Sequence, residues 1–216
     1  MLRQALAAIC AALTLTSCSV VLTSPETEGG AETTEELSFA DKRVLDMVGV
    51  AKEVNDGSYD RKAFGTSWKD VDRNRCDTRN DILARDLADI TKRDDCVVLS
   101  GVLKDDPYGD GSIDFDRARP TEVQIDHIYP LALAWRMGAS QWDKDKREKF
   151  ANDPDNLLAV GGRANQRKGD SGPEEWQPPR DYQCEYAKRF IGVALAYELP
   201  VTAEAHRKLG EMQKTC

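Results

Sequence analysis

Residues 123–130 read VQIDHIYP, a short apolar run that carries an aspartate and a histidine side by side. DNLLAV follows at residues 155–160 and NQRKGD at residues 165–170. The first stretch predicts a strand over 123–129, and the second apolar run predicts another over 157–160. A helix is expected to begin at 162. Two strands and a helix would therefore bring the polar residues of all three stretches together.

Those polar residues suit phosphodiester hydrolysis. A histidine with a near-neutral pKa can take a proton from water, which is the task open to His127. Asp126 and Asn165 offer oxygen ligands to one hard divalent ion, and so few protein ligands favour Mg²⁺ (or Mn²⁺). Neighbouring residues on a strand point to opposite sides, so Asp126 can hold metal while His127 faces water at a cleft edge. The expected phosphate contacts are Lys168, Arg167 and Arg163.

This pattern resembles the HNH, or ββα-metal, endonuclease motif in its Asp-His, Asn, Asn form. More narrowly, it resembles secreted proteins related to the C-terminal domain of GmrSD-type restriction enzymes. The resemblance is carried by QIDHIYPLALAWRMGASQW (124–142), FANDPDNLLAVGGRANQRKGD (150–170), EEWQPP (174–179), CDTRNDILARDL (76–87) and CVVLSGVLKDDPYGDG (96–111).

The resemblance implies a role for each motif position. His127 would be the general base, and Asp126 and Asn165 would be metal ligands. Asn156, counted with His127 in the catalytic set, would brace the loop between the two motif strands. The last position is Asn rather than His, which weakens the case for zinc or nickel. The implied activity is an HNH endonuclease whose substrate is DNA in preference to RNA.

The N-terminus predicts export. One Arg precedes an apolar run at residues 5–15 that is too short to span a bilayer. LTSC at 15–18 resembles the bacterial lipobox, which implies a lipoprotein signal peptide at 1–17 and a lipid on Cys18. An ordinary signal peptide with a chance cysteine is the alternative. Residues 18–38 are expected to be a flexible acidic tether, and 39–216 the nuclease domain. The expected location is extracytoplasmic, either anchored to the cell membrane by lipid or secreted.

Four further cysteines agree with an oxidising compartment and allow three pairings. Sequence order favours Cys76–Cys96 and Cys184–Cys216, because each pair closes a local loop. Such loops stabilise a fold by about 3–4 kcal/mol each in the chain-entropy model. A four-thiolate zinc site is the alternative, but no C-x-x-C spacing occurs.

The net charge of −8 opposes a nucleic-acid substrate, since proteins that bind polyanions are usually basic. Any positive field must be local. The charge favours an alternative of another class, a non-catalytic surface lipoprotein of the same fold that binds an envelope partner or nucleic acid. No protein partner can be inferred from one chain.

Two other polar stretches have structural explanations. DPYGDG at 106–111 is expected to be a hairpin turn rather than a calcium loop. Ion pairing is preferred to phosphate binding for the arginines around Cys76. The pairs would join Arg73, Arg75, Arg79 and Arg85 to Asp70, Asp72, Asp77 and Asp81.

The predicted fold class is α+β, with a ββα-metal core among several helices and two disulfides. The expected strands are 96–103, 112–115, 123–129 and 157–160. The expected helices are 39–54, 78–90, 131–137, 144–151, one from 162 to 168, 182–197 and 202–214.

Overall fold

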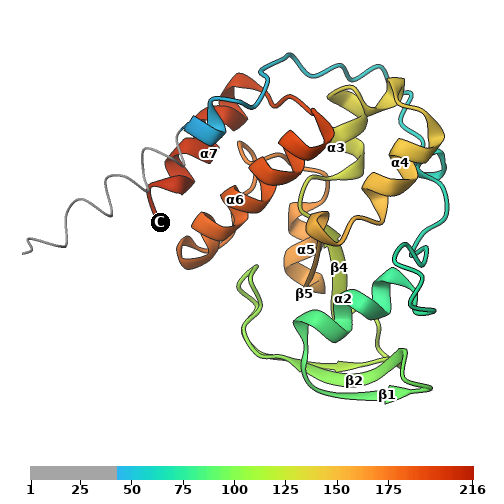
Figure 1. The fold of residues 1–216 in the computed structure, drawn as a ribbon. Helices are drawn as coiled ribbons and strands as arrows, with labels where there is room; N and C mark the ends of the chain where they lie inside the picture. The colour runs from blue at the N-terminus through green and yellow to red at the C-terminus, as the bar shows by residue number, and fades with distance from the viewer. Residues whose placement is uncertain (1–42) are drawn as a thin grey trace, which may run out of the picture.

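The computed structural model describes residues 43–216. The predicted signal peptide, the acidic tether and Cys18 lie outside the described residues. Figure 1 shows two strands and a short helix at the centre of the fold, with a separate sheet at one end and a pair of helices at the other.

The central unit is two antiparallel strands followed directly by a helix. β4 (Val123–His127) pairs with β5 (Leu157–Gly161), and the register places His127 opposite Leu157. α5 (Gly162–Lys168) starts at the residue after β5. A Cβ at Gly162 would lie 1.9 Å from the main-chain oxygen of Thr121, so only glycine lets the helix begin this close to the segment before β4.

The two faces of this small sheet are both covered, which explains why every residue of β5 is buried. Alternate residues of a strand point to opposite faces. Leu158 and Val160 belong to one hydrophobic cluster, and Leu157 and Ala159 belong to another. A strand buried on both faces reads as a continuous apolar run, as LLAV does here.

The larger cluster is built mainly from helices. They are α3 (Leu131–Arg136), α4 (Lys144–Ala151), α6 (Arg180–Tyr197) and α7 (Ala203–Gln213). Three short 3₁₀ turns accompany them. η1 (Arg61–Phe64) precedes all four helices in the chain, η2 (Ala139–Gln141) lies between α3 and α4, and η3 (Pro154–Asn156) follows α4. Among residues 43–216, no helix combines the length and apolar character needed to cross a membrane.

The smaller cluster joins the central unit to a second sheet. α2 (Thr78–Asp86) packs against β4 and β5 and against a three-stranded sheet. That sheet has the order β1 (Ala88–Arg93), β2 (Val97–Leu103) and β3 (Ile113–Asp116), with both pairs antiparallel. Residues 104–112 connect β2 to β3, so DPYGDG lies in a hairpin connection as expected.

The α+β class and both disulfide pairings are confirmed. Cys76–Cys96 links the start of α2 to the start of β2, and Cys184–Cys216 links α6 to the C-terminus. Their sequence separations are 20 and 32 residues. Each bond therefore closes a local loop, which restricts the unfolded chain.

Two predicted helices are wrong in extent. Within 39–54, residues 43–45 are helical, but the chain then extends and Val50 forms a parallel bridge with Val201. The expected helix 78–90 ends at Asp86, and its last residues enter β1. In both places main-chain pairing with another segment outweighs local helical periodicity: the partner is Val201 in the first case and the strand that follows directly, residues 97–103, in the second.

The predicted arginine–aspartate ion pairs are also wrong. Among the described residues, no ion pair joins the four arginines to the four aspartates proposed for them. Arg85 pairs instead with Asp86 and donates to the main-chain oxygens of Pro154 and Leu157. Arg79 donates to Pro120 and Val123. These arginines connect α2 to the central unit.

Candidate active site

A cleft of about 510 Å³ lies at the end of β4. Asp126, His127 and Asn165 all line it, so three residues predicted from sequence share one cavity. The strand contributes the first two, and α5 contributes the third. The other polar residues of its wall are Tyr59, Arg61, Arg136 and Asp170.

His127 is buried and held through one ring nitrogen. Nε2 lies 2.8 Å from the main-chain oxygen of Ala151, at the end of α4. A carbonyl oxygen only accepts, so Nε2 carries the proton and Nδ1 is the unprotonated nitrogen of the neutral ring. No described residue makes a hydrogen bond to Nδ1. Burial lowers the pKa of His127 to about 4, against smaller opposing effects from Ala151 and Asp126. The ring is therefore neutral at pH 7.

Asp126 is held from the protein interior. Its carboxylate lies 2.9 Å from the Nζ atom of Lys168 and accepts a 2.6 Å hydrogen bond from the hydroxyl of Tyr108. Lys168 also donates to the main-chain oxygen of His127. Burial, followed by the charge of Asp126, raises the pKa of Tyr108 well above its usual value, which keeps this hydroxyl a donor.

Lys168 was predicted to contact phosphate, but its ammonium is buried beside Asp126. Its side chain has no exposed surface. A buried ammonium between Asp126 and the β4 main chain is a support for the strand end. Contact with phosphate stays a prediction, and it would require the ammonium to leave this pair.

Asn165 has an oriented amide. Nδ2 donates to the side-chain oxygen of Gln124 at 2.9 Å, and no described residue donates to Oδ1. Gln124 precedes Asp126 by two residues on the same strand, so both are on one face. The amide oxygen is thereby left for another partner.

Asn156 closes the loop that follows β4. Its Oδ1 accepts from the Tyr129 amide at 2.8 Å, and its Nδ2 donates to the Tyr129 oxygen at 3.2 Å. Its main-chain oxygen accepts from Ile128. The side chain is fully buried. These contacts correspond to a bracing position, and its membership of the catalytic set stays a prediction.

Arg163 and Arg167 are not among the residues that line the cleft. Both lie near Asp110, at 3.8 Å and 3.3 Å, and both are largely exposed. Asp110 also accepts from the amide of Ala164 in the first turn of α5. Their predicted phosphate contacts would therefore lie on the outer side of α5, away from the imidazole.

Arg61 is a cleft residue that the sequence analysis did not identify. It lines the 510 Å³ cleft and a small cavity of about 20 Å³ that also touches His127. Among the described residues it has no ion-pair partner, whereas Arg136 is paired with Glu53 and Asp170. Nothing in the motif spacing points to Arg61, because it comes from a distant upstream turn.

The donors fit a magnesium ion in kind. Asp126 offers a carboxylate and Asn165 a free amide oxygen, and Mg²⁺ commonly uses one or two protein oxygens and several waters. Lys168 already balances the charge of Asp126, which lowers the expected affinity. Within the described chain, no three His, Cys, Asp or Glu side chains gather at a point where they could hold a metal ion.

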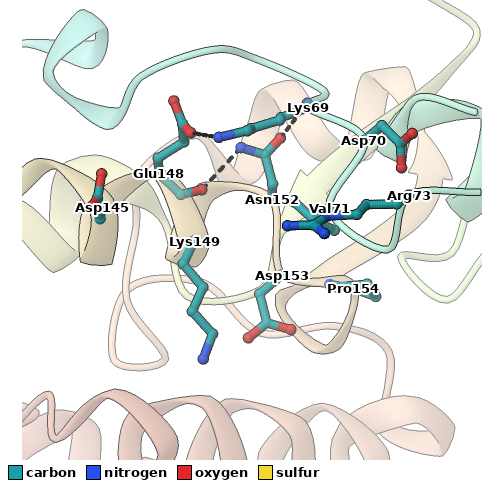
Figure 2. Close-up of a pocket in the computed structure, with 10 residues that line it drawn as sticks. All are labelled: Lys69, Asp70, Val71, Arg73, Asp145, Glu148, Lys149, Asn152, Asp153 and Pro154. Carbon is teal, nitrogen blue, oxygen red and sulfur yellow. Dashed lines mark hydrogen bonds and ion pairs between the residues drawn. The ribbon is translucent and has the colours of Figure 1, made fainter. Parts of the chain in front are cut away.

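A second cavity, of about 590 Å³, lies between α4 and the segment before α2 (Figure 2). Lys69 and Glu148 form an ion pair there, and Asn152 accepts from the Lys69 amide. Its residues do not include His127, Asp126 or Asn165. It is therefore a separate feature from the candidate active site.

One protein family matches the part of the chain that contains β4, β5 and α5. The family described as "GmrSD restriction endonucleases, C-terminal domain" matches residues 77–212. An "Uncharacterized secreted protein" of Arthroderma benhamiae is 40% identical over 144 residues, covering 65% of this chain and 68% of the relative. No solved structure matches the chain. The matched residues include β4, β5 and α5, whereas Arg61 lies upstream of them.

Proposed function

Because this chain belongs to the family of GmrSD restriction endonuclease C-terminal domains, we propose that it hydrolyses phosphodiester bonds in nucleic acid as an HNH-type endonuclease. DNA is the proposed substrate. The observation that carries the proposal is the meeting of Asp126, His127 and Asn165 in one cleft.

His127 is the proposed general base. Its Nε2 proton is engaged by Ala151, which leaves Nδ1 to accept a proton from the attacking water. A pKa of about 4 ensures the neutral form at pH 7 but also makes the ring a weak base. The charge of Arg61 contributes to this lowering. A phosphate that binds Arg61 would offset that charge, so substrate binding would raise the basicity of His127.

Asp126 and Asn165 would hold Mg²⁺ or Mn²⁺, which when bound supplies Lewis-acid stabilisation of the charge that develops on the phosphate. Gln124 would keep the oxygen of Asn165 available. Lys168 and Tyr108 would keep the Asp126 carboxylate in place. Outer contacts of this kind orient metal ligands in other proteins.

Arg61 is the proposed phosphate contact within the cleft. It lies beside His127, and its guanidinium is not neutralised by a carboxylate of the described chain. Arginine suits phosphate because its planar fork can make two parallel hydrogen bonds. An unpaired arginine in the cleft would give the local positive charge that a nucleic-acid substrate needs in a protein of acidic net charge.

The proposed location is outside the cytoplasm. Two disulfides indicate an oxidising compartment, and the fungal relative is named as secreted. We further propose cleavage of residues 1–17 and attachment of a lipid to Cys18. Mass spectrometry of the mature N-terminus tests this, and an unmodified Cys18 would leave a secreted enzyme.

A plasmid-nicking assay tests the activity. Purified protein is expected to nick DNA in the presence of Mg²⁺ or Mn²⁺, and EDTA is expected to abolish the nicking. His127→Ala should lose at least 99% of the rate, on the order of the contribution of a general base. His206→Ala is the matched control, because it removes the other histidine of the chain.

Two results would overturn the proposal. One is residual cleavage above a few per cent in folded His127→Ala. The other is absence of cleavage of both DNA and RNA with any divalent ion, which would favour the non-catalytic surface lipoprotein.

A further inference from the structure

A twelve-residue loop outside the cleft has the spacing of a calcium-binding loop. Residues 70–81 read DVDRNRCDTRND and are called here the acidic loop. Loops that bind Ca²⁺ between two helices take oxygen ligands from positions 1, 3, 5, 7, 9 and 12, with a main-chain oxygen at position 7. The side chains here at positions 1, 3, 5 and 12 are Asp70, Asp72, Asn74 and Asp81.

The loop is folded in the way this spacing requires. Arg75, at position 6, has a φ of 76°, where such loops use glycine to make a sharp turn. Its amide donates to Oδ2 of Asp70 at 3.0 Å. The amides of Asn74 and Cys76 donate to the side chains of Asp72 and Asn74. α2 begins at position 9, which places Asp81 in its first turn.

One oxygen of the partly buried residue Asp70 supports a cation at this loop. The Oδ1 atom of Asp70 is buried and has no hydrogen-bond partner. A buried carboxylate oxygen without a donor is unfavourable, and a cation is the partner that would satisfy it. In calcium loops the first residue is a ligand, and Asp70 occupies that position.

No ion pair among the described residues includes Asp70, Asp72 or Asp81. Figure 2 shows the Arg73 side chain extending into the neighbouring cavity, away from the Asp70 carboxylate. Arg79 lies over the Trp68 ring.

Asn74 connects the two remaining carboxylates. Its Nδ2 lies 3.0 Å from an oxygen of Asp72 and 3.0 Å from an oxygen of Asp81. The described acids are not already drawn around one point, and like charges are expected to stay apart until an ion joins them.

We propose that the acidic loop binds one Ca²⁺ ion. Asp70, Asp72, Asn74 and Asp81 supply side-chain oxygens, Cys76 supplies its main-chain oxygen, and water completes the shell. The hydroxyl of Thr78, at position 9, donates to Lys69, so water takes that place. The ion would join the segment before the loop to α2, beside the Cys76–Cys96 disulfide.

Two departures from the usual calcium-loop pattern lower the expected affinity for Ca²⁺. Position 12 is Asp rather than a bidentate Glu, and position 6 is Arg rather than Gly. We therefore expect a Kd on the order of 10⁻⁴–10⁻³ M, the range of extracellular calcium modules.

Calorimetry on the full-length protein, with its disulfides intact and metal removed by EDTA and dialysis, tests the site. One Ca²⁺ per chain is expected, and 10 mM Ca²⁺ should raise Tm by about 3–8 °C. Asp70→Asn combined with Asp72→Asn should abolish both effects. Asp95→Asn combined with Asp114→Asn makes the same charge change at exposed positions and should keep them.

His127→Ala should bind Ca²⁺ normally, which separates this site from the cleft. Absence of binding heat and of a Tm shift in wild-type protein at 10 mM Ca²⁺ would overturn the proposal. An equal loss of binding heat and Tm shift in the Asp95→Asn, Asp114→Asn control would mean that surface charge alone causes the effect, and this would also overturn the proposal. Equal affinity for Mg²⁺ would overturn the assignment of calcium.

Discussion

The imidazole of His127 is anchored to Ala151, whose main-chain oxygen lies 2.8 Å from Nε2. The contact joins the end of β4 to the end of α4, two elements that belong to different parts of the sequence. It determines which ring nitrogen carries the proton, and burial around it makes the protonated ring unfavourable. The same contact therefore bears on the proposed catalytic role of His127 and on stability.

The first prediction concerns stability in acid. The pKa of His127 is lowered from 6.5 to about 4, so between these pH values the unfolded chain binds a proton at this ring and the folded chain does not. Above about pH 6.5 this has no effect. As pH falls from 6.5 to 4, the free energy of unfolding should drop by about 3 kcal/mol from this group.

Urea unfolding of wild type and His127→Gln at pH 7 and pH 4.5 measures this contribution. The variant should lose less stability over the interval, by about 2–3 kcal/mol. His206→Gln should behave as wild type. An identical pH dependence in wild type and His127→Gln would show that the ring is not held in its neutral form.

The second prediction concerns the buried pair of Asp126 and Lys168. Lys168→Met leaves a carboxylate buried without its cation and should destabilise the fold by about 3–5 kcal/mol. Adding Asp126→Asn removes the unpaired charge, so the double variant should be more stable than Lys168→Met alone. A double-mutant cycle by urea unfolding gives the coupling. Additive effects of the two substitutions would contradict a buried ion pair.

Local patterns in the sequence account for the central unit and for most of the helices. Residues 123–126 alternate between apolar and polar, and residues 157–160 form a short apolar run. The two strands and the helix that follows them form close to the predicted bounds. β1 was missed because ADITKR has little apolar character and is largely exposed. Its strand conformation comes from pairing with β2, which local periodicity does not reveal.

The residues of the candidate site also fall into two groups, those that local spacing predicts and those that depend on the tertiary fold. Asp126, His127 and Asn165 could be found because their spacing is a property of one continuous motif. Arg61 could not, since its position beside His127 depends on how a distant segment folds back. The place of Lys168 one turn after Asn165 predicts a phosphate contact, but its ammonium is buried and forms an ion pair with Asp126.

The third prediction concerns the orientation of Asn165. Gln124→Leu removes the acceptor for its Nδ2 and frees the amide to rotate. Loss of an outer-shell contact typically reduces metal affinity by about 10-fold or more. The Mg²⁺ concentration for half-maximal nicking should rise by that factor, with a similar maximal rate. Gln166→Leu is the control, because it changes the same residue type on α5 without lining the cleft. An unchanged Mg²⁺ dependence in Gln124→Leu would remove Gln124 from the site.

The fourth prediction concerns Arg61. Arg61→Ala should lower kcat/KM for DNA cleavage by about 10–100-fold, since a charge-assisted hydrogen bond contributes about 1.5–3 kcal/mol. Arg61→Lys should recover only part of the rate, because an ammonium cannot make the paired contact of a guanidinium. Lys62→Ala removes the neighbouring charge of the same turn, which does not line the cleft, and should change the rate less than threefold. Equal effects of Arg61→Ala and Lys62→Ala would mean that the turn contributes only general positive charge. Because Arg61 lies upstream of residues 77–212, a specific loss would also extend the active site beyond the segment that defines the family.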